Sequence, residues 1–170
     1  VEALALTDRG SLYGAIEFYK ACKDADIKPI IGLDASIEGG SRLLLYAKDF
    51  AGYQNLLKLV TLSHRDDAAG RPLTRAELDA HSDGILILDP HDESGALHET
   101  DYLHPDDRRA WETMRAIENR GPVEEGDLGE DPDGEENSYH FYSAKEMSAR
   151  YSAAQLQKTL DIAAECNLEL

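Results

Sequence analysis

The chain has 170 residues, of which 34 are acidic and 17 are basic, and its formal net charge at pH 7 is −17. Because nucleic-acid affinity comes largely from Lys and Arg side chains that neutralise phosphates, this charge argues against direct binding of nucleic acid by the segment. No stretch approaches the roughly 20 consecutive apolar residues that cross a bilayer, so we expect no membrane contact and a cytoplasmic location. The acidic excess is spread along the whole length, which favours a salt-adapted (halophilic) source.

Short apolar runs alternate with amphipathic stretches along the chain, which predicts an α/β protein with mostly parallel strand pairing. The turn residues Glu38-Gly39-Gly40-Ser41 predict a hairpin between the second and third strands. We predict strands, in chain order, at 2–7, 28–34, 42–47 and 85–88, and an extended stretch at 139–142. We predict helices at 11–25, after Asp49 through Val60, after Thr74, from Pro105 through Ile117, and from Ser143 through Cys166.

Most of the predicted helices begin at residues that can cap free backbone N–H groups. Thr74 with Glu77, and Ser143 with Glu146, match the capping box, in which the first and fourth residues bond each other's backbone. The other predicted start residues are Ser11, Asp49 and Pro105.

One tract interrupts this regular pattern. Residues 118–138 contain Gly, Pro and acidic residues with almost no apolar side chain, which predicts a flexible acidic loop. We treat residues 1–170 as a single domain around this loop. The two cysteines, Cys22 and Cys166, lie in apolar helical patterns and are expected to be buried and reduced.

Several other residues have unremarkable expected roles. Trp111, Met114 and Ile117 recur at helical spacing and are expected to form helix core. Five histidines stand among polar neighbours and are expected to be exposed, namely His64, His81, His98, His104 and His140.

Four stretches taken together carry a family resemblance: ALALTDRG at 3–10, IKPIIG at 27–32, GYQNLLKL at 52–59 and TLDIAAECN at 159–167. In order and spacing they resemble the N-terminal PHP (polymerase and histidinol phosphatase) domain of bacterial DNA polymerase III alpha subunits. The resemblance implies a PHP-like irregular (β/α) barrel of strands wrapped by helices, with a metal cluster at the strand ends. The polymerase active site of such proteins lies outside the matched region, so we expect no catalysis by this segment alone.

The sequence also departs from the family in length. The family's first strand, which carries a His-x-His pair of metal ligands, and several central elements after Leu88 have no counterpart here. We therefore expect a truncated, internally shortened and incomplete barrel. Because an incomplete barrel exposes strand edges, a homodimer that covers them is one expected assembly.

The resemblance implies a degenerate metal site. The positions that match family ligands and could still bind a metal hold Asp8, Asp34, His91 and Glu99. Arg9 and Asp101 stand where the family has histidine, and a guanidinium is a permanent cation that cannot coordinate a metal. We expect Arg9 to pair with Asp8 or Asp34, because a cation among carboxylates must be compensated. We therefore expect no catalytic residue, no cofactor, and at most one adventitious divalent ion, zinc, manganese or magnesium.

These observations favour a structural and protein-interaction module of a replicative DNA polymerase, the parent family being DNA-directed polymerases (nucleotidyltransferases). Its expected partners are the remainder of the alpha subunit and a proofreading exonuclease subunit. One alternative is a metal-dependent phosphoesterase or 3'-5' exonuclease of the PHP superfamily that uses the remaining ligands. Another is a salt-tolerant binding domain that has left replication.

Overall fold

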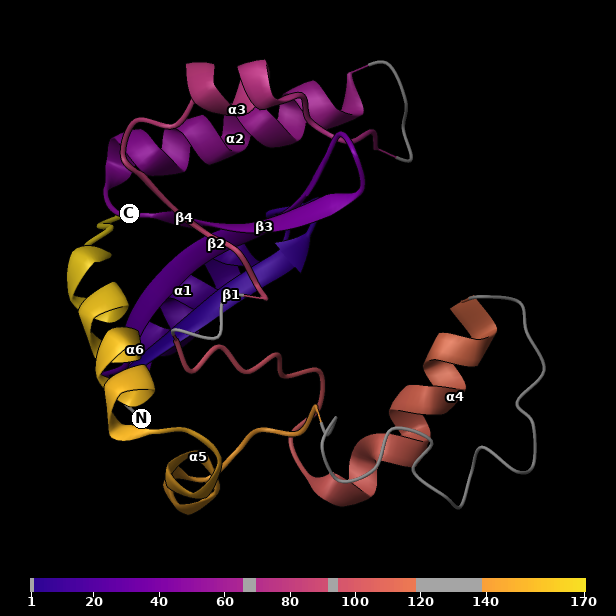
Figure 1. Ribbon diagram of the computed structural model, residues 1–170, viewed down its shortest axis with the longest axis vertical. Coiled ribbons are helices and arrows are strands. Elements are labelled where there is room, and N and C mark those ends of the chain that lie inside the picture. The colour runs from indigo at the N-terminus through magenta and orange to yellow at the C-terminus, as the bar shows by residue number, and fades with distance from the viewer. Residues whose placement is uncertain (1, 66–69, 92–94, 119–138) are drawn as a thin grey trace. The chain divides into compact units, whose positions relative to one another are not determined.

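The computed structural model describes residues 2–65, 70–91, 95–118 and 139–170. The chain divides into two compact units, Val1–Gly95 with Gln157–Leu170, and Ala96–Leu156 (Figure 1). A single domain over the whole chain stays a prediction. The predicted acidic loop at 118–138 lies outside the described residues, apart from Glu118, which ends a helix.

The first unit is built on a four-stranded sheet in the order β1-β2-β3-β4. The strands are β1 (Ala3–Arg9), β2 (Lys28–Ile37), β3 (Ser41–Ala47) and β4 (Ile85–Leu88), close to the four predicted positions. Only β1 and β2 are parallel; β3 is antiparallel to both β2 and β4, so the predicted predominance of parallel pairing is wrong in the described sheet. The antiparallel pairing of β2 with β3 has a local cause. Gly39 and Gly40 adopt φ values of 94° and 88° and turn the chain directly back, which forms the predicted hairpin. The mixed α/β class is confirmed, and a barrel stays a prediction.

Helices cover both faces of this sheet. On one face, α1 (Ala15–Asp24), α2 (Phe50–His64) and α3 (Arg75–Ala80) pack against the odd-numbered side chains of β2, such as Leu33 and Ala35. On the other face, the C-terminal part of α6 (Ala153–Glu165) and the following Cys166 pack against even-numbered side chains such as Ile30 and Tyr46. Strand alternation therefore decides which face each candidate site residue reaches.

Both cysteines are free and buried, as predicted. Burial raises the pKa of the Cys166 thiol to about 11, so it stays protonated at neutral pH. None of the described helices is long and apolar enough to cross a membrane.

The predicted caps are mostly confirmed. The Asp49 side chain accepts from the Gly52 N–H at 2.9 Å, and Thr74 and Ser143 begin helices with complete capping boxes. Ser11 is not the N-cap of α1, which begins at Ala15 after Gly14.

The predicted single C-terminal helix is also wrong, since α5 (Ala144–Arg150) and α6 are separate helices. The chain is extended at Tyr151, with φ −116° and ψ 143°. Ser152 then caps α6, because its hydroxyl accepts from the Gln155 N–H at 3.3 Å. A serine followed three residues later by glutamine is itself a capping-box pattern, so the sequence carried a signal for this break.

The second unit holds a 3-10 turn η1 (Pro105–Asp107) that leads into α4 (Arg108–Glu118), followed by α5. Pro105 opens this helical segment as predicted. The Trp111 ring lies 5.7 Å from the Tyr102 ring and 5.3 Å from the Tyr139 ring, centroid to centroid. Met114 and Ile117 are 69% and 68% exposed, so the expectation that they form helix core is wrong.

A cluster of histidine and tyrosine side chains forms the buried part of the second unit. His140 is only 8% exposed, which contradicts its predicted exposure, and its Nε2 lies 3.1 Å from the Glu146 carboxylate. The His98 ring stacks on Tyr142 with centroids 3.6 Å apart, and its Nε2 bonds the His140 carbonyl at 2.8 Å. His64, His81 and His98 are half-buried, and only His104 of the five is exposed.

His98 carries a pH dependence with a definite sign. Burial, together with repulsion from His140 and Arg150, lowers its pKa below the ordinary 6.5, whereas the hydrogen bond to the His140 carbonyl raises it. The unfolded chain therefore takes up a proton first as the pH falls. The stability that His98 contributes is complete above pH 6.5 and is lost as the pH falls from 6.5 through the folded pKa. Glu146, whose pKa is lowered to about 2 chiefly by hydrogen bonds from Ser143, stays ionised in this range.

Arg150→Gln removes one of the cations that repel protonated His98, so we expect the pKa of His98 to rise toward 6.5. An NMR titration of the His98 Cε1–H resonance in both proteins measures this change. A wild-type pKa at or above 6.5, or a fall in the pKa of the variant, would contradict this structure of the cluster.

The start of α2 packs on the turn that precedes β4. A Cβ atom at Gly52 would lie 1.9 Å from the Gly84 carbonyl oxygen, and Gly84 has a φ of 68°. The Asn55 side chain donates to the Asp83 carbonyl at 2.9 Å, so two successive turns of α2 contact this segment. Close backbone approach is therefore the reason for glycine at position 52.

Gly52→Ala distinguishes packing from helix propensity. Propensity alone predicts a gain of about 1 kcal/mol, because alanine is the better helix former. The clash with Gly84 predicts instead a net loss of about 1–3 kcal/mol in the free energy of unfolding, measured by urea denaturation. Ala51→Gly, at an exposed neighbouring position of α2, is the control and should cost about 1 kcal/mol through propensity only.

Candidate functional site

The centre of the candidate site is the carboxylate of Asp34, on β2, whose side chain is 4% exposed. Arg9, at the end of β1, is its register partner, and the Arg9 Nε lies 3.4 Å from Asp34 Oδ2. Arg42 donates from Nε to Asp34 Oδ1 at 3.1 Å and from Nη2 to Asp34 Oδ2. The predicted pairing of Arg9 with Asp34 is confirmed, and the buried carboxylate is held between two guanidinium groups.

Sequence reasoning missed Arg42. In the hairpin, Asp34 lies opposite Leu44 and Ser36 lies opposite Arg42. Residues two apart on a strand share a face, so Arg42 is a diagonal neighbour of Asp34. Counting outward from the two glycines of the turn would have shown this pair.

The charge of Asp34 also acts on the same face of the sheet. Burial raises the pKa of Tyr46 to about 12, with further increments from Cys166 and Asp34. Tyr46 is an even-numbered residue of β3 and belongs to the apolar cluster against α6. The Asp34 carboxylate therefore faces the α6 side of the sheet.

Asp8 lies on the other face. Its register partner on β2 is Leu33, which belongs to the core against α1 and α2. A Cβ atom at Gly14, just before α1, would lie 3.3 Å from Asp8 Oδ2, which places this carboxylate on the α1 side. The two candidate ligands that the sequence places on adjacent strands are thus directed to opposite faces of the sheet.

The remaining candidate ligands lie farther along the chain. His91 is exposed after β4, and its backbone N–H donates to Asp89 Oδ1 at 2.9 Å. Glu99 and Asp101 are exposed and belong to the second unit. In the part of the chain that the structure describes, no group of three or more His, Cys, Asp or Glu side chains is placed to hold a metal ion. A metal role for Asp8, Asp34, His91 and Glu99 stays a prediction.

A cleft of about 290 Å³ opens beside Arg9. β1 and the segment 71–73 follow one another along the same edge of β2, since the Gly10 N–H donates to the Asp34 carbonyl and the Leu73 N–H to the Ser36 carbonyl. The cleft lies along this edge between the end of β1 and the start of the segment 71–73. It is lined by Arg9, Gly10, Leu33, Ala35, Ser36, Ser63, His64, Gly70, Arg71, Pro72 and Leu73.

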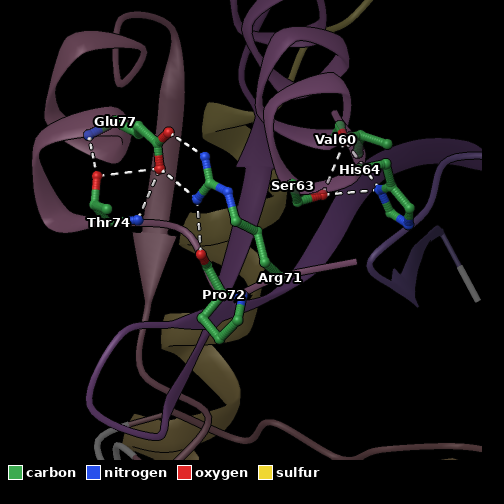
Figure 2. Close-up of polar contacts among 7 residues, drawn as sticks. All are labelled: Val60, Ser63, His64, Arg71, Pro72, Thr74 and Glu77. Carbon is green, nitrogen blue, oxygen red and sulfur yellow. Dashed lines mark hydrogen bonds and ion pairs between the residues drawn. The ribbon is translucent and has the colours of Figure 1, made fainter. Parts of the chain in front are cut away.

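His64, in the last turn of α2, contacts its own helix through one ring nitrogen (Figure 2). Its Nδ1 lies 3.0 Å from the Val60 carbonyl oxygen and 2.9 Å from the Ser63 hydroxyl, which itself donates to the same carbonyl at 2.8 Å. A proton on Nδ1 is compatible with both contacts, because the Val60 carbonyl only accepts. A Cβ atom at Gly70 would lie 3.2 Å from His64 Nε2, so this nitrogen is at the cleft wall.

The second arginine of the lining does not direct its charge into the cleft. Figure 2 shows the Arg71 guanidinium extending toward Glu77 and away from His64. Its Nη1 donates to Glu77 Oε2 at 3.0 Å and its Nη2 to Glu77 Oε1 at 2.5 Å. These bonds, followed by those from Thr74, lower the pKa of Glu77 to about 2. Arg71 therefore holds the segment 70–74 against α3.

Comparison with known proteins decides the family. The family model described as the PHP domain matches residues 1–120. This chain belongs to the PHP domain family. The resemblance carried by the four sequence stretches is thereby confirmed.

Curated relatives of this PHP domain are DNA polymerases. The DNA polymerase III subunit alpha of Halalkalibacterium halodurans is 44% identical over 93 residues, covering 52% of this chain and 8% of that protein. The DNA polymerase III subunit alpha of Thermus aquaticus is 38% identical over 102 residues, covering 51% and 8%. The error-prone DNA polymerase of Pseudomonas aeruginosa is 29% identical over 215 residues, covering 99% and 21%.

These matches cover only a small part of the length of each relative. The chain spans less than a tenth of the length of the alpha subunits, since it covers 8% of each, and about a fifth of the error-prone polymerase. The last alignment is longer than the 170 residues of this chain, so the error-prone polymerase has positions inside the aligned region that this PHP domain lacks.

Arg9 and Arg42 share one carboxylate but should differ in their effect on stability. Arg42 is 34% exposed and bonds both oxygens, so Arg42→Gln should lower the free energy of unfolding by about 2 kcal/mol. Arg9 is 57% exposed and makes a longer contact, so Arg9→Gln should cost about 0.5 kcal/mol. Urea denaturation of the two variants compares them directly. An equal or larger loss in the Arg9 variant would contradict this assignment of the dominant pair.

Proposed function

We propose that this PHP domain is a structural and protein-interaction module of a bacterial replicative DNA polymerase, with a metal site that no longer works. The observation that carries the proposal is the Asp34 carboxylate held by Arg9 and Arg42. The family resemblance implies that Asp34 stands at an acidic ligand position and that Arg9 stands where the family has histidine. The two guanidinium groups thus supply the positive charge that a ligand carboxylate would otherwise take from a metal ion.

The magnitude of the repulsion supports this proposal. A divalent ion 4 Å from one guanidinium is repelled by about 8 kcal/mol at an effective dielectric constant of about 20. Two such groups contact the same carboxylate, and Arg42 occupies both of its oxygens. An ion at Asp34 would have to displace these contacts and leave two cations without their buried partner.

The relatives supply the context of the proposal. Their names identify them as subunits or forms of DNA polymerase, so the first proposed partner is the remainder of an alpha subunit, in the cytoplasm. A proofreading exonuclease subunit is the second proposed partner. A homodimer through the exposed edge of β1 is the alternative assembly, because β1 is the outer strand of the described sheet.

Metal content separates this proposal from a metal-dependent phosphoesterase. We expect the chain, purified without chelator, to contain substoichiometric zinc, manganese and magnesium, and to show no manganese-dependent hydrolysis of bis(p-nitrophenyl) phosphate. Elemental analysis and a colorimetric assay measure both. Stoichiometric metal with hydrolysis that is lost in Asp34→Asn would establish the phosphoesterase instead.

The interaction role needs its own test. In a pull-down, we expect the chain to bind the remainder of its own polymerase, expressed as a separate tagged polypeptide. We expect the Asp34→Asn variant to lose this binding only if the variant is unfolded. Circular dichroism of the variant separates the two causes. Failure of the folded wild-type chain to retain either the polymerase remainder or an exonuclease subunit would reject the interaction role.

A further inference from the structure

The most exposed aliphatic side chains of the described residues lie in one short stretch of the second unit. Leu103, just before η1, is 66% exposed, and Met114 and Ile117 of α4 are 69% and 68% exposed. The next large aliphatic side chain in the described residues is Leu160 of α6, at 58%. Single exposed aliphatic residues are ordinary on a protein surface, but a concentration of them indicates a contact surface.

α4 carries apolar side chains on two of its faces. On one face, Trp111 packs against two tyrosine rings of the second unit. On another face, Ala110, Met114 and Ile117 follow one another at i, i+4 and i+7, and all three are exposed. A helix that is apolar on more than one face is normally covered on each of them. We call the three exposed residues the α4 stripe.

Two arginines flank the α4 stripe. Successive residues advance by about 100° around a helix, so Arg109 lies on one side of the stripe and Arg115 on the other. Both are exposed. The Arg115 guanidinium lies 5.3 Å from the centroid of the Trp111 ring, a contact that leaves its positive charge in place. Methionine and arginine are both enriched in protein interfaces, and a rim of arginines complements carboxylates on the partner.

The lengths of the relatives and the charge of the chain favour one occupant. The error-prone DNA polymerase of Pseudomonas aeruginosa aligns with 99% of this chain, and the alignment takes in only 21% of that protein. Most of the polymerase is therefore available to cover a surface of the aligned region. A second copy of this chain is a poorer occupant, because two molecules that each carry a formal charge of −17 repel one another.

We propose that the α4 stripe is the surface through which this PHP domain docks on the remainder of its polymerase. The partner that fits is an amphipathic helix whose apolar face is flanked by carboxylates. Met114 and Ile117 enter the apolar contact, and Arg109 and Arg115 meet the carboxylates at its rim. Docking of one helix face through residues at i, i+4 and i+7 is a known recognition mode. This inference rests on the proposed function, because it names the surface for the first proposed partner.

The test measures the dissociation constant between the 170-residue chain and the immobilised remainder of its own polymerase by biolayer interferometry. Met114→Glu places a charge in the apolar contact and should weaken binding at least tenfold. Leu160→Glu makes a matched change at an exposed position of α6 and should leave the affinity within about twofold. Equal affinities of the Met114 variant and the wild-type chain, or equal weakening by the two variants, would overturn the proposal.

A second pair of variants tests the charge of the partner. Arg109→Glu reverses one charge of the rim and should weaken binding about fivefold or more. Arg75→Glu reverses an exposed charge on α3 and should leave the affinity within about twofold. Unchanged or tighter binding by the Arg109 variant would reject a partner that carries carboxylates.

Two competing occupants give different results. If the first unit of the same chain covered the stripe, Met114→Glu would lower the midpoint of urea denaturation. We expect an unchanged midpoint, which also confirms that the variant is folded. If a second copy covered the stripe, light scattering in molar salt, where charge repulsion is screened, would give a dimer for the wild-type chain and a monomer for Met114→Glu. Either of these results would overturn the proposal.

Failure of this inference can be distinguished from failure of the proposed function. If the wild-type chain and the Met114 variant bind the polymerase remainder equally, the interaction role stands and the α4 stripe is rejected as its surface. If the folded wild-type chain does not bind the polymerase remainder, the proposed partner and the proposed surface are rejected together.

Discussion

A carboxylate buried in a sheet must be compensated, and in this molecule the compensation comes from two arginines on the neighbouring strands. Asp34 is almost fully buried, and an uncompensated charge there would be strongly destabilising. The parallel register brings Arg9 opposite Asp34, and the hairpin brings Arg42 to its diagonal. The pairing of three strands and the electrostatics of the site are therefore parts of one arrangement.

Strand alternation then divides the candidate ligands. Asp34 reaches the α6 face, whereas Asp8, one residue before Arg9, reaches the face covered by α1 and α2. A multi-metal centre needs carboxylates that converge on a common point. In the described sheet, the carboxylates of Asp8 and Asp34 point to opposite faces. The guanidinium of Arg9, the residue after Asp8, contacts Asp34. This divergence supports the structural role that we propose.

Much of the local structure could be predicted from the sequence, because it depends on neighbouring residues. The capping boxes at Thr74 and Ser143, the cap at Asp49 and the glycine turn of the hairpin are each specified within about four residues. The break before α6 was equally local, and its signal at Ser152 and Gln155 was overlooked.

What could not be predicted depends on contacts between distant segments. The antiparallel pairing of β3 with β4 follows two intervening helices, and no local pattern specifies it. The burial of His140 depends on Tyr142 and on α5, although its neighbours in sequence are polar. The cleft depends on the segment 71–73 continuing the edge of β2 beyond β1, and on Gly10 and Gly70 leaving room beside His64.

The most direct test of the central claim is a crystal structure of the chain grown with manganese and measured for anomalous scattering. This account predicts an Asp34 carboxylate still bonded by Arg42 and Arg9, with no anomalous peak within the roughly 2–2.6 Å that separates a divalent ion from its oxygen ligands. A manganese ion coordinated by Asp34, with both guanidinium groups displaced, would contradict it.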